Sequence, residues 1–471
     1  MLNTFCLRIL LVAAVLLHSF LMSTQSQHPH DPPTVQNNST HSTRVTSSKE
    51  ERRILGATLV GTTIEWYDFF IYAQAAGLVF ATQFFKPLGE DNSTLAQIVS
   101  WASLGISFLF RPLGAAIAGH LGDRYGRKLV LSATLILMGL ATAAIGVLPT
   151  YGSIGVAAPI LLILLRVLQG FSAGGEWGGA ALLAVEHAPK SKRGLYGSYP
   201  QIGVPLGLAF ATTVLLILTA IVGKDGYMEW AWRIPFVLSL VLVIVGVIVR
   251  LKVAESPVFE EIRERAEESS APLGVLLRNH FPLVFKAALI FAANNAFGYM
   301  VIAFFGSYAA KQLGMNQTHI FLAVILAAIA WTALTLWSGS LSDRIGRRQA
   351  FMIGYALLFV LAIPVWFLID TANIFWFGVA LLALIPGLAL SYGPQSAMYA
   401  ELFPRSIRFS GVSVGYALGS ILGGAFAPMI AQLILGKTGA TWTIGIYLMV
   451  LCVLSMIALA MTPKDLHHRE L

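Results

Sequence analysis

Long apolar runs alternate with short polar gaps along most of the chain. A helix needs about 20 mostly apolar residues to cross about 30 Å of hydrocarbon, and an open strand would leave backbone hydrogen bonds unsatisfied there. The runs that are long enough cover residues 54–82, 95–119, 129–149, 156–186, 195–222, 232–251, 283–310, 319–339, 350–369, 374–398, 410–436 and 441–462. We therefore predict an all-α membrane protein with twelve transmembrane helices.

A charged decapeptide occurs twice, each time in a gap between two apolar runs. Residues 119–128 read GHLGDRYGRK, and residues 339–348 read GSLSDRIGRR. A second pair, EHAPKSKR at 186–193 and ELFPRSIR at 401–408, repeats at nearly the same offset and shares Glu, Pro and the final Arg. Two unrelated motifs at nearly one offset indicate a tandem duplication. We expect two six-helix bundles, residues 54–251 and 283–462, arranged as the parallel repeats of a transporter.

Three further segments lie outside these bundles. Residues 1–53 are an N-terminal extension, in which an apolar stretch over 9–22 precedes a polar tail. That stretch is short for a crossing helix, so it is a cleaved signal, an extra anchor, or sequence upstream of a true start at Met22, the reading we favour. Residues 252–282 are expected to form a charged cytoplasmic linker, and residues 463–471 a cytoplasmic tail.

Composition agrees with a membrane protein. Hydrophobic residues make up 56% of the 471 and charged residues 11%, with a mean hydropathy of +0.74, outside the range of soluble chains. The net charge of +8 is concentrated in turns that the positive-inside rule assigns to the cytoplasm, so we expect no nucleic acid partner. Both termini are expected in the cytoplasm and the chain in the cytoplasmic (inner) membrane of a bacterium.

Metal, redox and ATP chemistry find no support in the sequence. Cys6 and Cys452 lie in separate apolar segments, which offers neither a disulfide framework nor a metal cluster. No Gly-rich turn ends in Lys-Ser/Thr, as a phosphate-binding loop would. We expect no cofactor other than a proton gradient.

The repeated decapeptides predict a conformational latch. We expect the acid of each copy to follow the end of one helix and the cations to open the next, so that the acid pairs with a cation or a helix N-terminus in one conformation only. The alternative is a turn that only sets topology; the latch is favoured because Asp and Gly are kept in both copies. The latch residues are Gly119, Asp123, Arg124, Gly126, Arg127, Gly339, Asp343, Arg344, Gly346 and Arg347.

Five ionisable residues fall inside predicted helices of the first bundle. A charge inside a crossing helix costs about 2.5 to 3.5 kcal/mol unless it is paired or hydrated, so each is a functional candidate. Counted along their helices, Glu65, Arg111 and Glu176 share one depth, and Asp68 and Arg166 share another. We expect at least one of the acids to carry the coupling proton. The alternative is a static buried salt bridge.

The substrate candidates are one cation and several neutral side chains. Arg166 can bind a carboxylate through two parallel hydrogen bonds, which suits an organic anion. Adjacent Asn294 and Asn295 face different directions, so at most one is expected to line the cavity fully. For the tyrosines, helix packing is an equal alternative. The expected substrate-binding residues are Arg166, Tyr72, Gln169, Asn294, Tyr299, Tyr392 and Gln395.

These motifs resemble the metabolite:proton symporter family of the major facilitator superfamily, which includes shikimate, α-ketoglutarate, citrate and proline/betaine carriers. The resemblance covers about residues 52–465. The residues that carry it are EWYDF at 65–69, FRPLG at 110–114, RVLQGF at 166–171, GGEWGG at 174–179, WRIPF at 232–236 and ESPVF at 255–259. It implies a monomeric secondary transporter, not an enzyme, in which a small-molecule substrate and protons cross the lipid bilayer together.

We expect the substrate to be a small organic carboxylate, shikimate-like or dicarboxylate-like, moved by alternating access. A rival with the same fold exports an amphiphilic cation in exchange for protons, with Glu65 or Asp68 binding the cargo; a surplus of buried arginine over unpaired acid argues against it. A second rival is a membrane sensor that binds ligand without transport.

Overall fold

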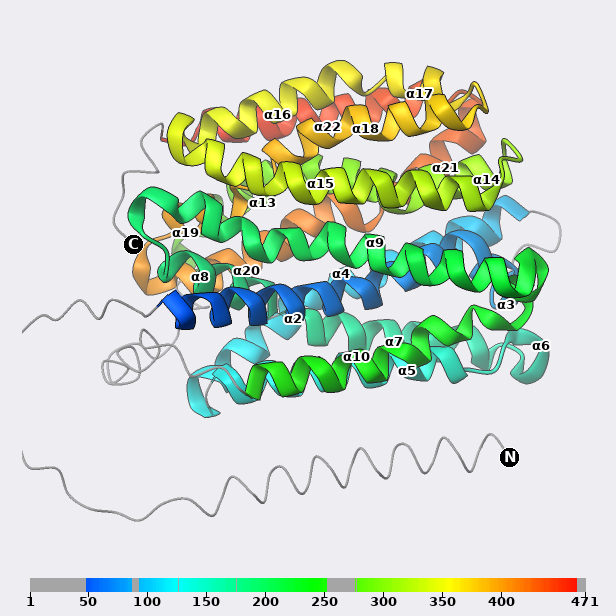
Figure 1. Cartoon of the computed structure of the whole chain (residues 1–471), viewed down its shortest axis with the longest axis horizontal. Helices are drawn as coiled ribbons and strands as arrows, with labels where there is room; N and C mark the ends of the chain where they lie inside the picture. Colours follow the sequence, from blue (N-terminus) through cyan, green and yellow to red (C-terminus); the bar gives the residue numbers. More distant parts are fainter. Residues whose placement is uncertain are drawn as a thin grey trace, which may run out of the picture. The chain divides into compact units, whose positions relative to one another are not determined.

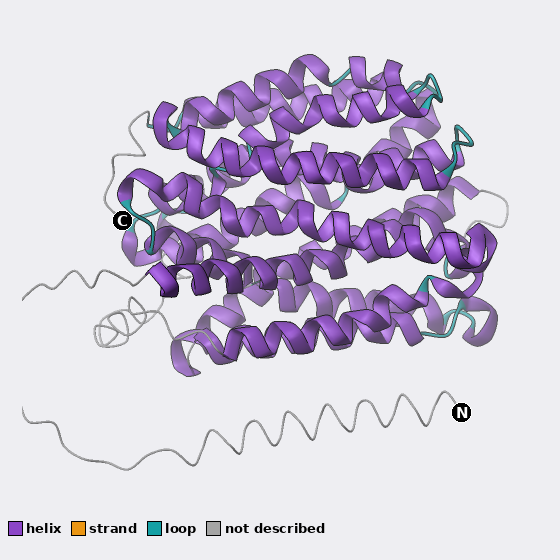
Figure 2. Cartoon of the chain, viewed as in Figure 1, coloured by secondary structure: helices purple, strands orange, loops and turns teal. Residues whose placement is uncertain are grey.

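The computed structural model describes residues 48–86, 93–125, 127–174, 176–251, 276 and 278–463, and residues 49–471 form one compact unit. Every regular element in these described ranges is helical (Figure 2). Residues 1–47 of the N-terminal extension, residues 252–275 and 277 of the linker, and the tail from residue 464 lie outside the described residues.

The first six predicted crossings correspond to helices that are continuous or broken by one short turn. Their bounds are α2 Ser48–Ala75, η1 Ala76–Phe80, α3 Ala81–Gln83, α4 Ser93–Tyr125, α5 Arg127–Val147, α6 Tyr151–Ile154, α7 Ala157–Ala173, α8 Glu176–Glu186, η3 Lys190–Lys192, α9 Arg193–Gly226, η4 Tyr227–Ala231 and α10 Arg233–Leu251.

The last six crossings follow the same pattern. Their bounds are α13 Phe281–Tyr299, η6 Met300–Phe304, α14 Phe305–Lys311, α15 Gln317–Ile345, α16 Arg347–Leu361, α17 Pro364–Ile369, α18 Ile374–Leu390, α19 Gln395–Leu402, η7 Arg405–Ile407, α20 Arg408–Gly419, η8 Ser420–Ala425, α21 Ala427–Thr438 and α22 Trp442–Ala460. Among the described residues, eight helical stretches are long and apolar enough to cross a membrane, and two shorter apolar helices add to them.

Glycines let the helices that carry the buried arginines approach each other closely. A Cβ atom on Gly170 of α7 would lie 1.9 Å from the carbonyl oxygen of Ser107 in α4, and one on Gly114 of α4 would lie 1.9 Å from the carbonyl oxygen of Phe171 in α7. Both distances are far below van der Waals contact, so larger residues would separate the helices. The backbone contact between α4 and α7 brings Arg111 and Arg166 together.

The two halves of the chain meet along several helix pairs. Helix α9 of the first half packs along α15 of the second, and these two run side by side in Figure 1. Helix α4 packs against α20 and α21, and α8 packs against α19 and α20. The contacts run from the decapeptide end of α15 to its other end, so the space between the halves is closed at both.

The decapeptide gaps are shorter than the sequence predicted. Helix α15 continues through Ile345 and α16 begins at Arg347, with only Gly346 between them at a φ of +92°. A glycine in this conformation ends a helix by itself. The expectation that the acid follows the helix end is therefore wrong for Asp343, which lies in the last turn of α15.

Candidate functional site

The five charged residues predicted inside the first bundle are all buried. They come from four helices and have at most 4% of their surface exposed: Glu65 and Asp68 on α2, Arg111 on α4, Arg166 on α7 and Glu176 at the start of α8. Of these helices, α4 and α7 are in backbone contact.

Three of these residues line one cavity of about 260 Å³, a volume that includes any space open to solvent. Glu65, Arg111 and Arg166 lie around it. The other lining residues are Phe69, Ser107, Met138, Gln169, Gly170 and Ala173. We had assigned Glu65 and Arg111 to one depth in the membrane and Arg166 to another. All three line the same cavity, because the long side chain of Arg166 spans the distance between the two depths. We call it the arginine cavity.

Arg166 is held by neutral partners. Its Nη1 donates to Gln169 Oε1 at 2.7 Å, and its Nη2 donates to Ser107 Oγ at 2.7 Å and to the carbonyl oxygen of Leu104 at 3.0 Å. The guanidinium carbon also lies 3.7 Å from the centre of the Tyr72 ring, a cation–π geometry. The hydroxyl of Tyr72 is hydrogen-bonded to Ser103 Oγ at 2.7 Å, so Tyr72 supports Arg166 through its face.

Asp68 and Arg166 form no direct ion pair among the described residues. Thr142 Oγ1 donates to Asp68 Oδ2 at 3.2 Å, and Gln169 Nε2 donates to Thr142 Oγ1 at 2.6 Å. Asp68 Oδ1 is buried and has no hydrogen-bond partner in the described part of the chain. Thr142 and Gln169 therefore lie between Asp68 and Arg166 and link them through hydrogen bonds.

Arg111 lies among aromatic rings. Its guanidinium carbon is 4.4 Å from the centre of the Phe108 ring, 5.6 Å from that of Phe69 and 5.7 Å from that of Trp66. Such contacts stabilise a buried guanidinium while leaving its N–H groups directed sideways. Among the charges predicted at one depth, Glu176 is absent from the arginine cavity, but it interacts electrostatically with Asp68.

A second cavity, of about 280 Å³, adjoins the first on the side of the second half. We call it the aromatic cavity. Its lining residues are Trp66, Val204, Phe291, Asn294, Asn295, Gly298, Tyr299, Ile302, Trp331, Tyr392 and Tyr416. The ring of Tyr299 lies 5.5 Å from the ring of Phe69, which lines the arginine cavity. These two packed rings therefore lie between the two cavities.

Four hydrogen-bond donors of the aromatic cavity's residues have no partner within the described ranges: Trp66 Nε1, Asn295 Nδ2, Tyr299 OH and Trp331 Nε1. The neighbouring Asn294 is occupied, because its Nδ2 donates to the carbonyl oxygen of Leu388 and to Ser391 Oγ. Both asparagines line the cavity, yet only Asn295 keeps an unused donor.

Of the remaining predicted substrate residues, Tyr392 lines this cavity and Gln395 does not. Tyr392 stacks on Phe291, with ring centres 6.2 Å apart. Gln395 Oε1 accepts a hydrogen bond from Gln201 Nε2 at 3.2 Å, and Gln201 also donates to the carbonyl oxygen of Tyr392 at 3.0 Å. Gln395 is therefore part of a contact between α9 and α19, outside the cavity lining.

Sequence reasoning missed several residues of the site. Trp66, Trp331 and Tyr416 were not singled out because an aromatic residue in an apolar helix has the same pattern whether it packs or lines a cavity. Thr142 was missed because a lone threonine in an apolar helix usually bonds to its own backbone, and it does so here with the carbonyl oxygen of Met138 at 2.9 Å. Gln201 carried a signal that was overlooked, since it is a polar residue two turns inside the predicted crossing 195–222.

The predicted latch of the second half contacts the first half. Asp343 accepts hydrogen bonds from the backbone N–H groups of Gly194 at 2.8 Å and Leu195 at 3.0 Å, at the start of α9. It also pairs with Arg347 at 2.6 Å, and Arg347 pairs with Glu401 at 3.1 Å. Asp343 thus meets both a cation and a helix N-terminus.

Among the other predicted latch residues, the structure describes Gly339 and Arg344 of the second copy but not the charged side chains of the first copy. A Cβ atom on Gly339 would lie 2.6 Å from the carbonyl oxygen of Gly194, so this glycine permits the contact between α15 and α9, whereas Arg344 is exposed. In the first copy, α4 reaches Tyr125 and α5 begins at Arg127, but the side chains of Asp123, Arg124 and Arg127, and all of Gly126, lie outside the described residues.

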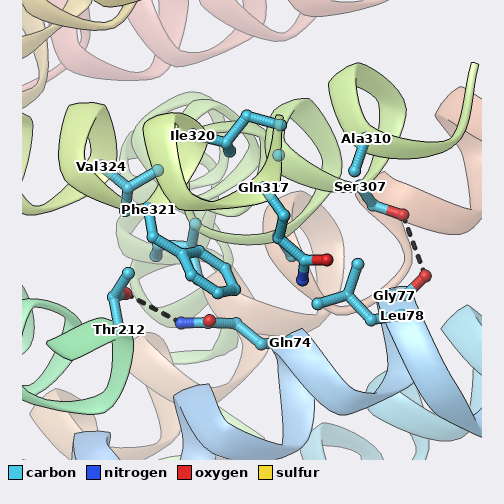
Figure 3. Close-up of a pocket in the computed structure, with 13 residues that line it drawn as sticks. Gln74, Gly77, Leu78, Thr212, Ser307, Ala310, Gln317, Ile320, Phe321 and Val324 are labelled. Carbon is cyan, nitrogen blue, oxygen red and sulfur yellow. Dashed lines mark hydrogen bonds between the residues drawn. The ribbon is translucent and has the colours of Figure 1, made fainter. Parts of the chain in front are cut away.

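The opposite end of α15 contributes to a third cavity, of about 390 Å³, which also lies between the halves (Figure 3). Gln74 Nε2 donates to Thr212 Oγ1 at 2.9 Å, and Ser307 Oγ donates to the carbonyl oxygen of Gly77 at 3.0 Å. Nearby, Lys311 Nζ donates to Gln97 Oε1 at 2.7 Å. Contacts between the halves therefore exist at both ends of the unit.

Comparison with known proteins identifies the family. The model of the Major Facilitator Superfamily matches residues 58–415. The inner membrane metabolite transport protein YhjE of Escherichia coli (strain K12) is 39% identical, over 91% of this chain and 97% of that protein. The shikimate transporter of the same strain is 37% identical, over 89% and 95%. The proline/betaine transporter of Salmonella typhimurium (strain LT2) is 32% identical, over 89% and 85%.

Solved structures show the same fold at low identity. The crystal structure of a D-xylose–proton symporter matches with a TM-score of 0.69 and 16% identity, over 88% of this chain and 98% of that one. A partially occluded, inward-open structure of the E. coli xylose transporter XylE matches with the same TM-score and 14% identity, over 88% and 99%. The chain therefore belongs to the major facilitator superfamily, and within it to the metabolite:proton symporter family, as a multi-pass membrane transporter and not an enzyme.

Proposed function

We propose that this transporter moves a small hydroxylated carboxylate together with a proton across a bacterial cytoplasmic membrane. The observation that carries the proposal is the arginine cavity, in which two buried guanidinium groups and one carboxylate surround a single space next to a donor-rich aromatic cavity. The protein works as a monomer, with both termini in the cytoplasm and the proton gradient as its source of energy.

A carboxylate substrate fits the charges of the arginine cavity. Arg111 and Arg166 outnumber Glu65 there, so an anionic group between the guanidiniums would offset the excess of positive charge. Guanidinium and carboxylate form short, charge-assisted hydrogen bonds that are strong in a buried site. An amphiphilic cation would instead face two like charges.

The aromatic cavity favours hydroxyl groups on the rest of the substrate. Its four unused donors require acceptors in the ligand, because a buried donor left unpaired costs about 1 to 3 kcal/mol. Hydroxyl oxygens provide such acceptors, whereas the trimethylammonium group of a betaine accepts no hydrogen bond. The ring faces of Phe291 and Tyr392 can pack on the carbon skeleton.

Asp68 is our favoured proton site. It is 1% exposed, and the side chains that hydrogen-bond to it, Thr142 and Ser239, are neutral hydroxyls. The surroundings therefore do not fix the carboxylate in its charged form as a direct arginine partner would. Glu65, which lines the arginine cavity, and Glu176 are further candidates, and Arg111 and Arg166 provide the cations that respond to proton uptake.

Transport in this proposal is by alternating access. The contacts of Asp343 with α9 close one end, and those of Ser307 and Lys311 with the first half close the other. Opening the transporter at either end requires the contacts at that end to break. The decapeptides of both halves act as the latch on the cytoplasmic end, which the positive-inside rule assigns to them.

Uptake into proteoliposomes tests the proposal. The purified full chain is supplied with labelled shikimate, α-ketoglutarate or glycine betaine, with an inward proton gradient and with a protonophore. We expect shikimate to accumulate only with the gradient and to exchange in counterflow without it. Gradient-independent uptake contradicts proton coupling, preferential uptake of glycine betaine contradicts the substrate class, and binding without any flux identifies a sensor.

A further inference from the structure

We propose that Thr142 and Gln169 form a hydrogen-bond relay through which Arg166 responds to the protonation of Asp68, so that the proton and the substrate carboxylate bind cooperatively. This inference rests on the proposed function, since it assigns the coupling step of that same site. It gives Thr142 and Gln169 the role of positioning residues between two charged groups.

The relay is a continuous chain of three short contacts. Arg166 Nη1 donates to Gln169 Oε1 at 2.7 Å, Gln169 Nε2 donates to Thr142 Oγ1 at 2.6 Å, and Thr142 Oγ1 donates to Asp68 Oδ2 at 3.2 Å. All four side chains are buried, with 5% exposure or less. The chain therefore lies in surroundings of low dielectric, where hydrogen bonds in series polarise one another.

The amide of Gln169 has one permitted orientation. Its oxygen must face Arg166, because a guanidinium has donors only. Its NH₂ group then faces Thr142 and donates to the hydroxyl oxygen. The amide dipole thus directs its positive end toward Asp68, so ionisation of Asp68 strengthens every contact back to Arg166.

The hydroxyl group of Thr142 has a single hydrogen, and two acceptors compete for it. One is Asp68 Oδ2 at 3.2 Å and the other is the carbonyl oxygen of Met138 at 2.9 Å. When Asp68 is ionised, the hydrogen is drawn toward the carboxylate. When Asp68 takes up a proton on Oδ2, its new O–H group donates to Thr142, and the Thr142 hydrogen remains with Met138.

The hydroxyl oxygen can serve both states. It has two lone pairs, so it accepts from Gln169 and from protonated Asp68 at once. No group of the relay then loses its partner when the proton arrives. What changes is the negative end of the chain, because a neutral Asp68 no longer reinforces the hold of Gln169 on Arg166.

Cooperative binding follows from this difference. Protonation of Asp68 makes Arg166 easier to draw toward a substrate carboxylate in the arginine cavity, where Arg166 is a lining residue. By linkage, a bound carboxylate that draws Arg166 away favours the protonated form of Asp68 to the same extent. Proton and anion therefore enter together, as symport requires.

Other charged groups near the relay act on it from different helices. Glu176 of α8 interacts with Asp68, and Tyr67 is the titratable neighbour of Asp68 on α2. Arg111 of α4 and Tyr299 of α13 interact with Arg166. These electrostatic interactions act through space and do not need Thr142. Removing the threonine hydroxyl therefore abolishes the relay and leaves these direct interactions in place.

Infrared titration of the full chain in lipid measures this directly. The C=O stretching band that Asp68→Asn removes reports protonated Asp68, and its titration midpoint is compared in a double-mutant cycle of Arg166→Gln and Thr142→Val. We expect Arg166→Gln to shift the midpoint by about one pH unit with Thr142 present, and by less than about half of that in Thr142→Val. Equal shifts in both backgrounds would mean that only direct electrostatics connects the residues, and would overturn the relay.

Three further variants keep the result interpretable. Gln169→Leu breaks the same chain at its other link, so adding it to Thr142→Val should cause no further shift. Thr142→Ser keeps the hydroxyl and should restore the coupling. Thr332→Val is the matched control, because the Thr332 hydroxyl donates only to the carbonyl oxygen of Ala328 in its own helix; its cycle with Arg166→Gln should match the wild type. None of these measurements requires transport, so a failed uptake assay contradicts the proposed function and leaves the relay test intact.

Discussion

Trp177 and Tyr416 stack face to face across the two halves of the protein, with ring centres 3.7 Å apart and an angle of 11° between the planes. Tyr416 also lines the aromatic cavity. Trp177 Nε1 donates to Gln201 Oε1 at 2.9 Å, and Gln201 Nε2 donates to Gln395 Oε1 of α19 at 3.2 Å. The stack therefore connects the wall of the cavity to the contacts that close the decapeptide end.

Trp177→Ala should shift the protein toward the form that is open at the decapeptide end. The variant removes a stacked aromatic pair, which contributes about 0.5 to 1.5 kcal/mol beyond burial, and the hydrogen bond to Gln201. Distances between spin labels on α9 and α15 measure the shift, and we expect a longer-distance population to grow. Trp337→Ala is the control, because Trp337 is 52% exposed; an unchanged distance distribution in Trp177→Ala would contradict the role of the stack.

Much of this architecture could be predicted from sequence. Twenty-residue apolar runs have few stable alternatives to a crossing helix, and the five charges inside them marked the site because burial of a charge needs a reason. The depth of Arg166 was less well predicted, since position along a helix says little about where the end of a long side chain lies.

Contacts that depend on packing between distant helices could not be predicted. Thr142 and Gln169 lie on α5 and α7, and nothing in either segment specifies that their side chains meet between Asp68 and Arg166. The short turn at Gly346 was missed for a different reason: a charged decapeptide suggests a loop, whereas one glycine with positive φ is enough to connect two helices.

Asp343→Asn should slow turnover while leaving substrate binding unchanged. The carboxylate accepts two backbone hydrogen bonds at the start of α9 and pairs with Arg347. Loss of the negative charge weakens these contacts by about 1 to 3 kcal/mol, a factor of about 5 to 150 in the equilibrium between closed and open forms. Initial exchange rates and equilibrium binding of labelled shikimate separate the two effects. Asp370→Asn is the matched control, because Asp370 bonds to Tyr308 and Thr441 within the second half; similar losses in both variants would argue against the latch.

Arg166→Lys should weaken binding of a carboxylate substrate by about tenfold or more. A lysine ammonium keeps the charge but cannot hold Gln169, Ser107 and Leu104 in a planar geometry while it binds a carboxylate through two parallel bonds. The concentration for half-maximal counterflow measures the change. Arg233→Lys, at a residue that bonds to the backbone of Gly146 and Leu148, should leave it unaltered, and normal affinity in Arg166→Lys would remove the arginine from substrate binding.

Tyr299→Phe and Trp331→Phe should each discriminate against hydroxylated substrates. Each variant deletes a buried donor that has no acceptor among the described residues while retaining most of the aromatic wall of the cavity. Loss of a hydrogen bond to a substrate hydroxyl costs about 0.5 to 1.5 kcal/mol, so we expect shikimate to bind up to about tenfold more weakly. A carboxylate of similar size without hydroxyl groups should bind as well as before or better, because the deleted donor no longer needs a partner. Displacement assays with both compounds measure the difference, with Tyr447→Phe, whose ring does not line the aromatic cavity, as the control. An equal loss of affinity for the two compounds would mean that the residues shape the cavity without recognising hydroxyl groups.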